Sequence, residues 1–235
     1  MNNTNNASAR ASYDIAKQIL YNSWIKSFDG RSKDCMDWVN GRKLSQSEIR
    51  LEVELNTTNT SFTFGMTPNQ ANSTGVVFNT ENRLNLQDSL IAPEYGIFVS
   101  QPASRVSTAF TLQTYGNTQV FAAADAAALD STFYSNGNFQ MNVNNDVIIP
   151  YRGLFNHWYI PQTQQTAALG AASPKTQIRG AEDGFITQEP NVLLIGSKNY
   201  VPQIQFKTAL ASAAAFMRCT LIFRGILAQN STVVN

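Results

Sequence analysis

The sequence has few of the side chains that enzymes and metalloproteins normally use. Its 235 residues include one histidine, His157, and two cysteines, Cys35 and Cys219, which are far apart and form no CxxC pair. Structural zinc and redox sites usually need closely spaced Cys and His residues. No phosphate-loop or nucleophile motif is present either. We therefore expect no enzymatic activity, catalytic residue, metal or cofactor, and we expect Cys219 to be a small buried apolar side chain.

Charge and long apolar runs are also scarce. Charged residues make up 14% of the chain and the formal net charge is +1, whereas an average globular protein has roughly 25% charged residues. Because nucleic-acid binding normally needs a basic surface, we predict no specific nucleic-acid partner. No stretch reaches the roughly 18 consecutive apolar residues of a membrane span, and the polar start of the chain lacks a signal-peptide pattern.

Two stretches with alternating side chains predict the longest strands. In Glu48–Leu55 the odd positions are apolar and the even positions are charged, which is the period of a half-buried strand. In Phe216–Leu227, Cys219 and its alternate neighbours would face a core while Arg218 and Arg224 face the other way. Opposite charges on neighbouring strands attract. We therefore predict that these two strands pair, with the arginines facing Glu52 and Glu54, and that the chain closes on itself.

The N-terminal region predicts one amphipathic helix. Tyr13, Leu20 and Trp24 recur at helical spacing between Ser12 and Phe28, and Ser12 is a suitable cap. We expect residues 1–9 to form a disordered arm and Lys33–Lys43 to form a charged connector. The predicted division is therefore an arm, helix and connector over 1–44 and a β-sandwich over 45–235. The helix packs across the β-domain or reaches another subunit or a membrane surface.

The rest of the chain alternates short apolar runs with turn signals, as in an antiparallel sandwich or barrel. The Ala-rich run Val120–Leu129 is the exception and predicts a short inserted helix that includes Phe121. Further strands are expected at 62–64, 76–78, 83–86, 95–99, 105–115, 139–143, 147–149, 192–195 and 201–207, with a turn at Ala92–Pro93.

An aromatic segment and a long loop are the remaining features. Tyr151–Ile160 predicts a strand whose Trp158 and Tyr159 belong to the core or form a stacking surface for a sugar. The excursion from Pro161 to Gly184 has little apolar periodicity, and loops of this length are commonly functional or flexible.

The layout of residues 10–230 resembles that of jelly-roll capsid proteins of tailless, in some cases membrane-containing, viruses and bacteriophages. The resemblance rests on the paired strands Glu48–Leu55 and Phe216–Leu227 and on the run Arg83–Leu86 leading to Tyr95–Val99. It implies an all-β jelly roll, or alternatively a compact double jelly roll. It also implies a virion shell subunit that assembles with its own copies and other virion proteins, with the N-terminal helix as a contact to a membrane surface.

Tyr13, Leu20, Trp24 and Phe121 are then the candidate subunit contacts. The competing hypothesis is a receptor-binding or carbohydrate-binding β-sandwich of a phage fibre or cell surface, which would use Trp158 and Tyr159.

Overall fold

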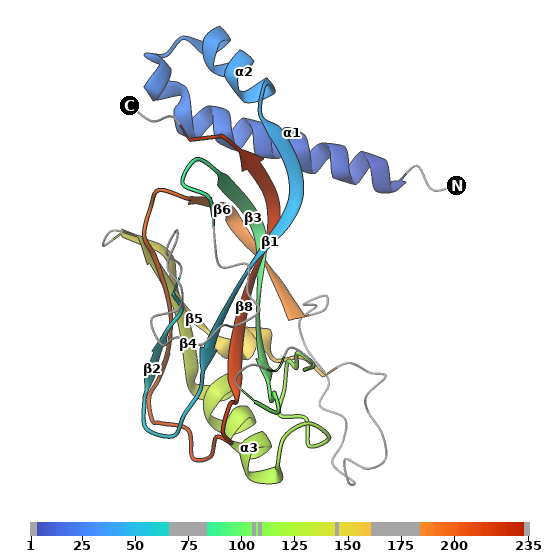
Figure 1. The fold of residues 1–235 in the computed structure, drawn as a ribbon, viewed down its shortest axis with the longest axis vertical. Helices are drawn as coiled ribbons and strands as arrows, with labels where there is room; N and C mark the ends of the chain where they lie inside the picture. Colours follow the sequence, from blue (N-terminus) through green and yellow to red (C-terminus); the bar gives the residue numbers. More distant parts are fainter. Residues whose placement is uncertain are drawn as a thin grey trace.

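The protein is a β-sandwich with helices at its two ends (Figure 1). The computed structural model describes residues 4–65, 84–104, 107, 110–143, 146–160 and 184–232. Its strands form two four-stranded antiparallel sheets, with the orders β1-β8-β3-β6 and β2-β7-β4-β5. The first sheet contains β1 (Lys43–Glu54), β3 (Ser89–Ser100), β6 (Phe185–Ile195) and β8 (Arg218–Gln229). The second contains β2 (Ser61–Thr63), β4 (Gly137–Val143), β5 (Asp146–Gly153) and β7 (Tyr200–Phe206). The predicted all-β sandwich is confirmed.

The helices lie outside the two sheets. At one end, α1 (Thr4–Trp24), the 3₁₀ turn η1 (Ile25–Phe28) and α2 (Ser32–Asn40) form a helical hairpin. At the other end lies α3 (Ala123–Ala128), which continues as the π-helical turn η2 (Leu129–Tyr134) (Figure 1). The short 3₁₀ turn η3 (Leu154–His157) follows β5. The helix predicted in the Ala-rich run is therefore present.

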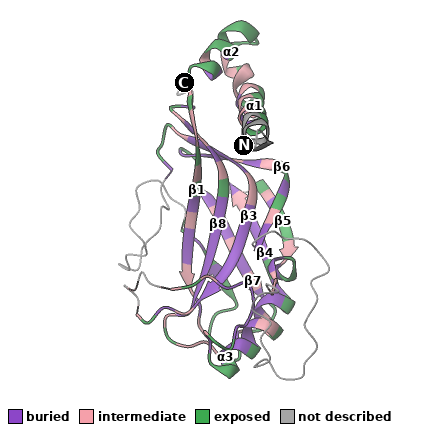
Figure 2. Cartoon of the chain, turned by 90° about the vertical axis from the view of Figure 1, so that its right-hand side faces the viewer, coloured by how far each residue is buried: buried purple, intermediate pink, exposed green. Residues whose placement is uncertain are grey.

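Alternating side chains from both sheets fill the main core between them. Figure 2 shows that buried residues occur along the strands of both sheets. Cys219, Leu221 and Phe223 of β8 point into this core, as predicted, and Cys219 is fully buried. From the other sheet, Phe139 and Ile204 meet them in the same cluster. Burial of apolar surface, worth roughly 25 cal/mol per Å², is the main force that holds the two sheets together.

The predicted pairing of the first and last long strands is confirmed. β1 and β8 are antiparallel neighbours over their whole length. Arg218 binds Glu52 across the two strands, with 3.1 Å between Nη1 and Oε2. The expected partner of Arg224 was wrong, because the register places Arg224 opposite Glu48, at 3.7 Å, and not opposite Glu54.

The hairpin has its own small core. Leu20 and Ala16 of α1 pack with Cys35 and Val39 of α2 and with the strand ends at Ile91, Ile226 and Ala228. Trp24 and Trp38 are in edge-to-face contact at 6.4 Å between ring centroids. This cluster shares none of its fully buried residues with the main core.

Two predictions at the N-terminus are wrong. A disordered arm was expected over residues 1–9, but residues 4–9 belong to helix α1. No proline or glycine occurs before Gly30, and nothing therefore stops the helix from extending toward the N-terminus. The expected connector Lys33–Lys43 is mostly helix α2, whose Cys35 and Val39 lie one turn apart and face the hairpin core.

The described part of the chain also corrects several strand predictions. Residues 110–115 form a loop with one bridge, between Gln113 and Val99, and residues 84–86 are not a strand. The aromatic strand ends at Gly153, where η3 begins. Pro93 lies inside β3 and coincides with a β-bulge, a place where a missing N–H is tolerated. The predicted strand 76–78 and residues 161–183 of the long loop lie outside the described residues.

Candidate interaction surfaces

The candidate contact residues of α1 pack against the protein's own hairpin core. Leu20 is fully buried, while Tyr13 and Trp24 are half-buried against the same cluster. Phe121 is 2% exposed and belongs to the main core. Leu20 and Phe121 therefore stabilise the fold and do not lie on its surface.

Two other apolar side chains of the hairpin are on the surface. Ile15 of α1 is 50% exposed and Met36 of α2 is 43% exposed. Ile15 lies inside the predicted amphipathic helix, and Met36 lies in the segment that was predicted to be a connector. The packing of the two helices, and not the sequence pattern, determines which of their apolar side chains are exposed and which are buried.

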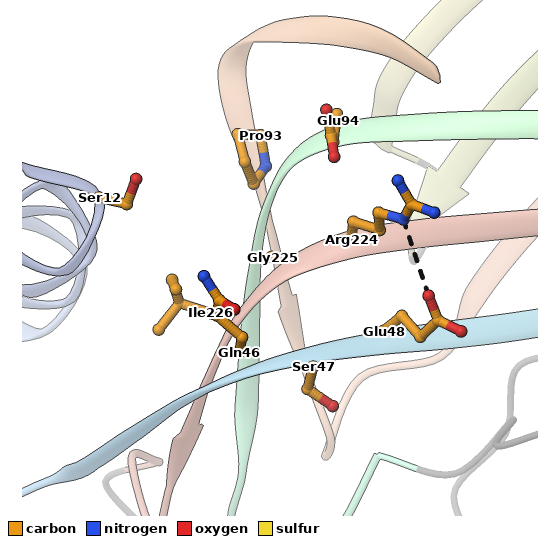
Figure 3. A pocket seen from close by; sticks show the side chains of 9 residues that line it. All are labelled: Ser12, Gln46, Ser47, Glu48, Pro93, Glu94, Arg224, Gly225 and Ile226. Atoms are coloured by element: carbon orange, nitrogen blue, oxygen red, sulfur yellow. Dashed lines mark ion pairs between the residues drawn. The ribbon is translucent and has the colours of Figure 1, made fainter. Parts of the chain in front are cut away.

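A groove of about 580 Å³ lies between α1 and the bent ends of the first sheet (Figure 3). Its lining comes from α1, β1, β3 and β8: Ser12, Gln46, Ser47, Glu48, Pro93, Glu94, Arg224, Gly225 and Ile226. The strands bend at Pro93 and at Gly225 (Figure 3). A Cβ atom at position 225 would come within 1.9 Å of the Ile91 carbonyl oxygen, so glycine allows this close crossing of β8 and β3.

Arg224 lies at the centre of this groove between two carboxylates. It pairs with Glu48 of β1 and is opposite Glu94 of β3 in the strand register. Its guanidinium also lies 3.6 Å from the centre of the Phe185 ring. Arg224 and Glu48 are about half exposed, and the groove therefore offers donors and acceptors of both charges to a polar chain segment or small polar ligand.

A second charge cluster is buried and has a structural role. The Glu52 carboxylate is buried and accepts hydrogen bonds from Arg218 Nη1, at 3.1 Å, and from Arg50 Nε, at 2.9 Å. Both guanidinium groups lie over the Phe110 ring, at 5.5 and 5.1 Å from its centre. Arg218 is 1% exposed, so it is not available to a ligand.

The predicted aromatic surface is only partly formed. Trp158 stacks on Phe155, with 5.9 Å between ring centroids and 12° between ring planes, and Phe155 is 60% exposed. The Trp158 indole N–H donates to Asp130 at 3.0 Å. Tyr159 is half-buried, and its backbone N–H and C=O bind Thr114. The exposed rings of this region are therefore those of Phe155 and Tyr151.

His157 lies in the interior and has the environment of a packed histidine. It is 1% exposed, and its ring centre is 5.1 Å from that of Tyr95. Burial lowers the pKa of His157 from 6.5 to about 3; a backbone bond with Gly184 raises it, and the positive charge of Arg152 lowers it further. The imidazole is therefore neutral at neutral pH.

The described residues contain neither a cluster of metal ligands nor a membrane-spanning helix. Over the described ranges, no three His, Cys, Asp or Glu side chains form a group that could hold a metal ion. No described helix combines the length and apolar character needed to cross a membrane.

No protein-family model matches the chain, and no curated protein sequence matches it either.

Proposed function

We propose that this protein is a structural subunit of a virion shell, built as a single jelly roll, and that it acts by self-assembly. The observation that carries the proposal is the pairing of the strands. β1 pairs with β8, β2 with β7, β3 with β6 and β4 with β5.

This pairing has a simple topological meaning. A long antiparallel hairpin of eight strands has the first strand beside the last and the second beside the seventh. Wrapping such a hairpin around a core brings β3 against β8 and β4 against β7, the two contacts that complete the sheets. Eight strands in two packed sheets with this order are the pattern of a jelly roll, which is used in viral capsids and in other protein classes.

The shape of the helical hairpin formed by α1 and α2 supports an assembly role. Helix α1 has 21 residues, or a length of about 31 Å, and its N-terminal half extends beyond the sandwich (Figure 1). Ile15 and Met36 give this hairpin exposed apolar side chains, which subunit interfaces typically bury. In the proposed shell, a second copy covers this surface, and other virion proteins or a membrane surface contact the protruding helix.

The experiment is to purify the full chain and measure its mass by light scattering after size-exclusion chromatography, with negative-stain electron microscopy of the same fractions. We expect closed, symmetric oligomers or particles at high concentration. Ile15→Glu should raise the protein concentration needed for assembly at least tenfold, because it places a charge in the interface. Gln119→Glu adds the same charge at an exposed glutamine just before α3, at the other end of the sandwich, and this matched control should assemble normally. A protein that stays monomeric at all concentrations contradicts the proposal.

A further inference from the structure

The two sheets differ sharply in charge. In the sheet β1-β8-β3-β6, every strand contains at least one charged residue. In the other sheet, β2, β4 and β7 contain no Asp, Glu, Lys or Arg, and only β5 at the edge carries Asp146 and Arg152. Strands of a half-solvated sheet usually alternate apolar residues that face the core with polar and charged residues that face water. An outer face with almost no charged residues is therefore unusual.

Amide and hydroxyl groups take the place of charges on this face. Phe62, Phe139, Met141, Ile204 and Phe206 point into the main core, so the residues between them point outward. We call the outward set the amide face. It consists of the exposed Ser61, Thr63 and Asn138, the half-buried Asn142, Val201, Gln203 and Gln205 and the buried Gln140, together with the exposed Tyr151 of β5.

Hydrogen bonds connect the amide face across all four strands. Gln203 of β7 is the centre: its Oε1 accepts from Gln140 of β4 at 3.0 Å and from Gln205 at 3.1 Å. Its Nε2 donates to Ser61 of β2 at 2.6 Å. The Tyr151 hydroxyl of β5 donates to Gln205 Oε1 at 2.9 Å. The carboxamides are therefore held in fixed orientations before any ligand arrives.

These groups keep part of their bonding capacity. A carboxamide has two N–H donors and an oxygen with two lone pairs, and in this network Gln205 uses one N–H and accepts one bond. Neighbouring strands place the groups about 4.8 Å apart, and alternate residues along a strand are about 7 Å apart. A flat grid of paired donors and acceptors on this scale matches the hydroxyl groups of sugar rings.

We propose that the amide face binds a neutral carbohydrate. Its planar amides donate to and accept from sugar hydroxyls, and the Tyr151 ring, which is 59% exposed, supplies an apolar surface for the C–H face of a sugar. A second protein copy fits less well. Protein interfaces have an apolar centre, whereas Val201 is the one aliphatic residue on the outward positions of β2, β4 and β7. Buried amides would also need a complete set of partners.

The test uses the full-length protein on an array of immobilised oligosaccharides. The neutral probes end in glucose, galactose, mannose, fucose, rhamnose or N-acetylglucosamine, and sialylated and uronic-acid glycans serve as charged probes. We expect binding to neutral glycans, with an affinity that changes less than twofold between 50 and 500 mM salt because no charge is involved. Gln203→Ala and Tyr151→Ala should each reduce binding at least tenfold. Gln18→Ala on α1 is the matched control and should bind normally.

Three results would overturn the proposal. These are an absence of binding to every neutral probe, binding that Gln203→Ala and Tyr151→Ala leave unchanged, and preferential, salt-sensitive binding to the acidic glycans. Circular dichroism and thermal melting show that each variant is folded, and light scattering shows its oligomeric state. If Gln203→Ala gives the second result and also changes the oligomeric state, the face is assigned to a contact between copies. The inference does not rest on the shell function, since a monomer is equally able to bind.

Discussion

At the scale of single residues, the most informative group is the buried charge cluster on the outer side of the first sheet. Glu52 holds two guanidinium groups, those of Arg50 and Arg218, and these share the ring of Phe110. Taking charges out of water is costly, and the cost is offset only when each charge has a good partner. Glu52 is the centre of the cluster, because both guanidinium groups bind its carboxylate.

This arrangement predicts unequal effects of two substitutions. Glu52→Gln removes the buried carboxylate that both guanidinium groups bind and should lower the free energy of unfolding by roughly 3–5 kcal/mol. Arg218→Met should cost less, because Arg50 still neutralises Glu52 and a methionine fills most of the space. Urea unfolding of both variants measures the difference.

The exposed ion pair of the neighbouring groove provides the control. Arg224 and Glu48 are 46% and 53% exposed, and surface ion pairs contribute about 0–1 kcal/mol. Arg224→Met should therefore change stability by less than about 1 kcal/mol. If Glu52→Gln is as mild as Arg224→Met, the Glu52 cluster is hydrated and the argument from burial is wrong.

At the scale of elements, the sequence predicts strands well where side chains alternate strictly. Glu48–Leu55 and Phe216–Leu227 have this pattern, and their opposite charges were enough to predict that they pair. Pairing also requires register, and the sequence pattern does not fix it. For this reason Arg224 was assigned to Glu54 when its partner is Glu48.

Other elements have signals that depend on tertiary contacts. Helix α2 has 9 residues, which is too short to be stable alone. The helix is stabilised when its apolar residues pack against α1. The amide face was missed for a related reason. Its glutamines come from β4 and β7, about 60 residues apart in the sequence, and the register of the sheet brings them together.

The separate core of the hairpin predicts that this element can open without the sandwich. Leu20→Ala should remove roughly 2–5 kcal/mol of packing energy from that core. Hydrogen exchange should then accelerate for the amides of α1 and α2, while the amides of β4 and β7 keep their protection. Mass spectrometry of peptides after exchange measures both regions in one experiment.

A core substitution in the sandwich is the comparison. Ile204 of β7 is fully buried in the main core, so Ile204→Ala should lower protection in the strands of both sheets. If Leu20→Ala lowers the protection of β4 and β7 as much as Ile204→Ala does, the hairpin and sandwich unfold as one unit and the prediction fails.

At the scale of the whole molecule, the low content of charged residues and the single histidine give a simple dependence of stability on pH. Above about pH 5 most carboxylates are ionised in the folded and unfolded chains, so His157, the one histidine of the sequence, dominates the profile near pH 6. Its pKa is about 3 in the folded protein, whereas an unperturbed histidine has a pKa of 6.5. The unfolded chain therefore binds a proton as the pH falls through 6.5, and the folded chain does not until about pH 3.

Because the unfolded state binds more protons in this window, His157 contributes stability above pH 6.5 that is lost as the pH falls toward 3. The expected loss is about 2 kcal/mol between pH 7 and pH 5. His157→Phe fills the same buried site beside Tyr95 without a titrating group, and it should flatten the profile over this range. Urea unfolding of both proteins at pH 7, 6 and 5 measures the slopes. Equal slopes would mean that the imidazole is hydrated in the folded protein and that the packed interior around η3 opens to water far more readily than its 1% exposure indicates.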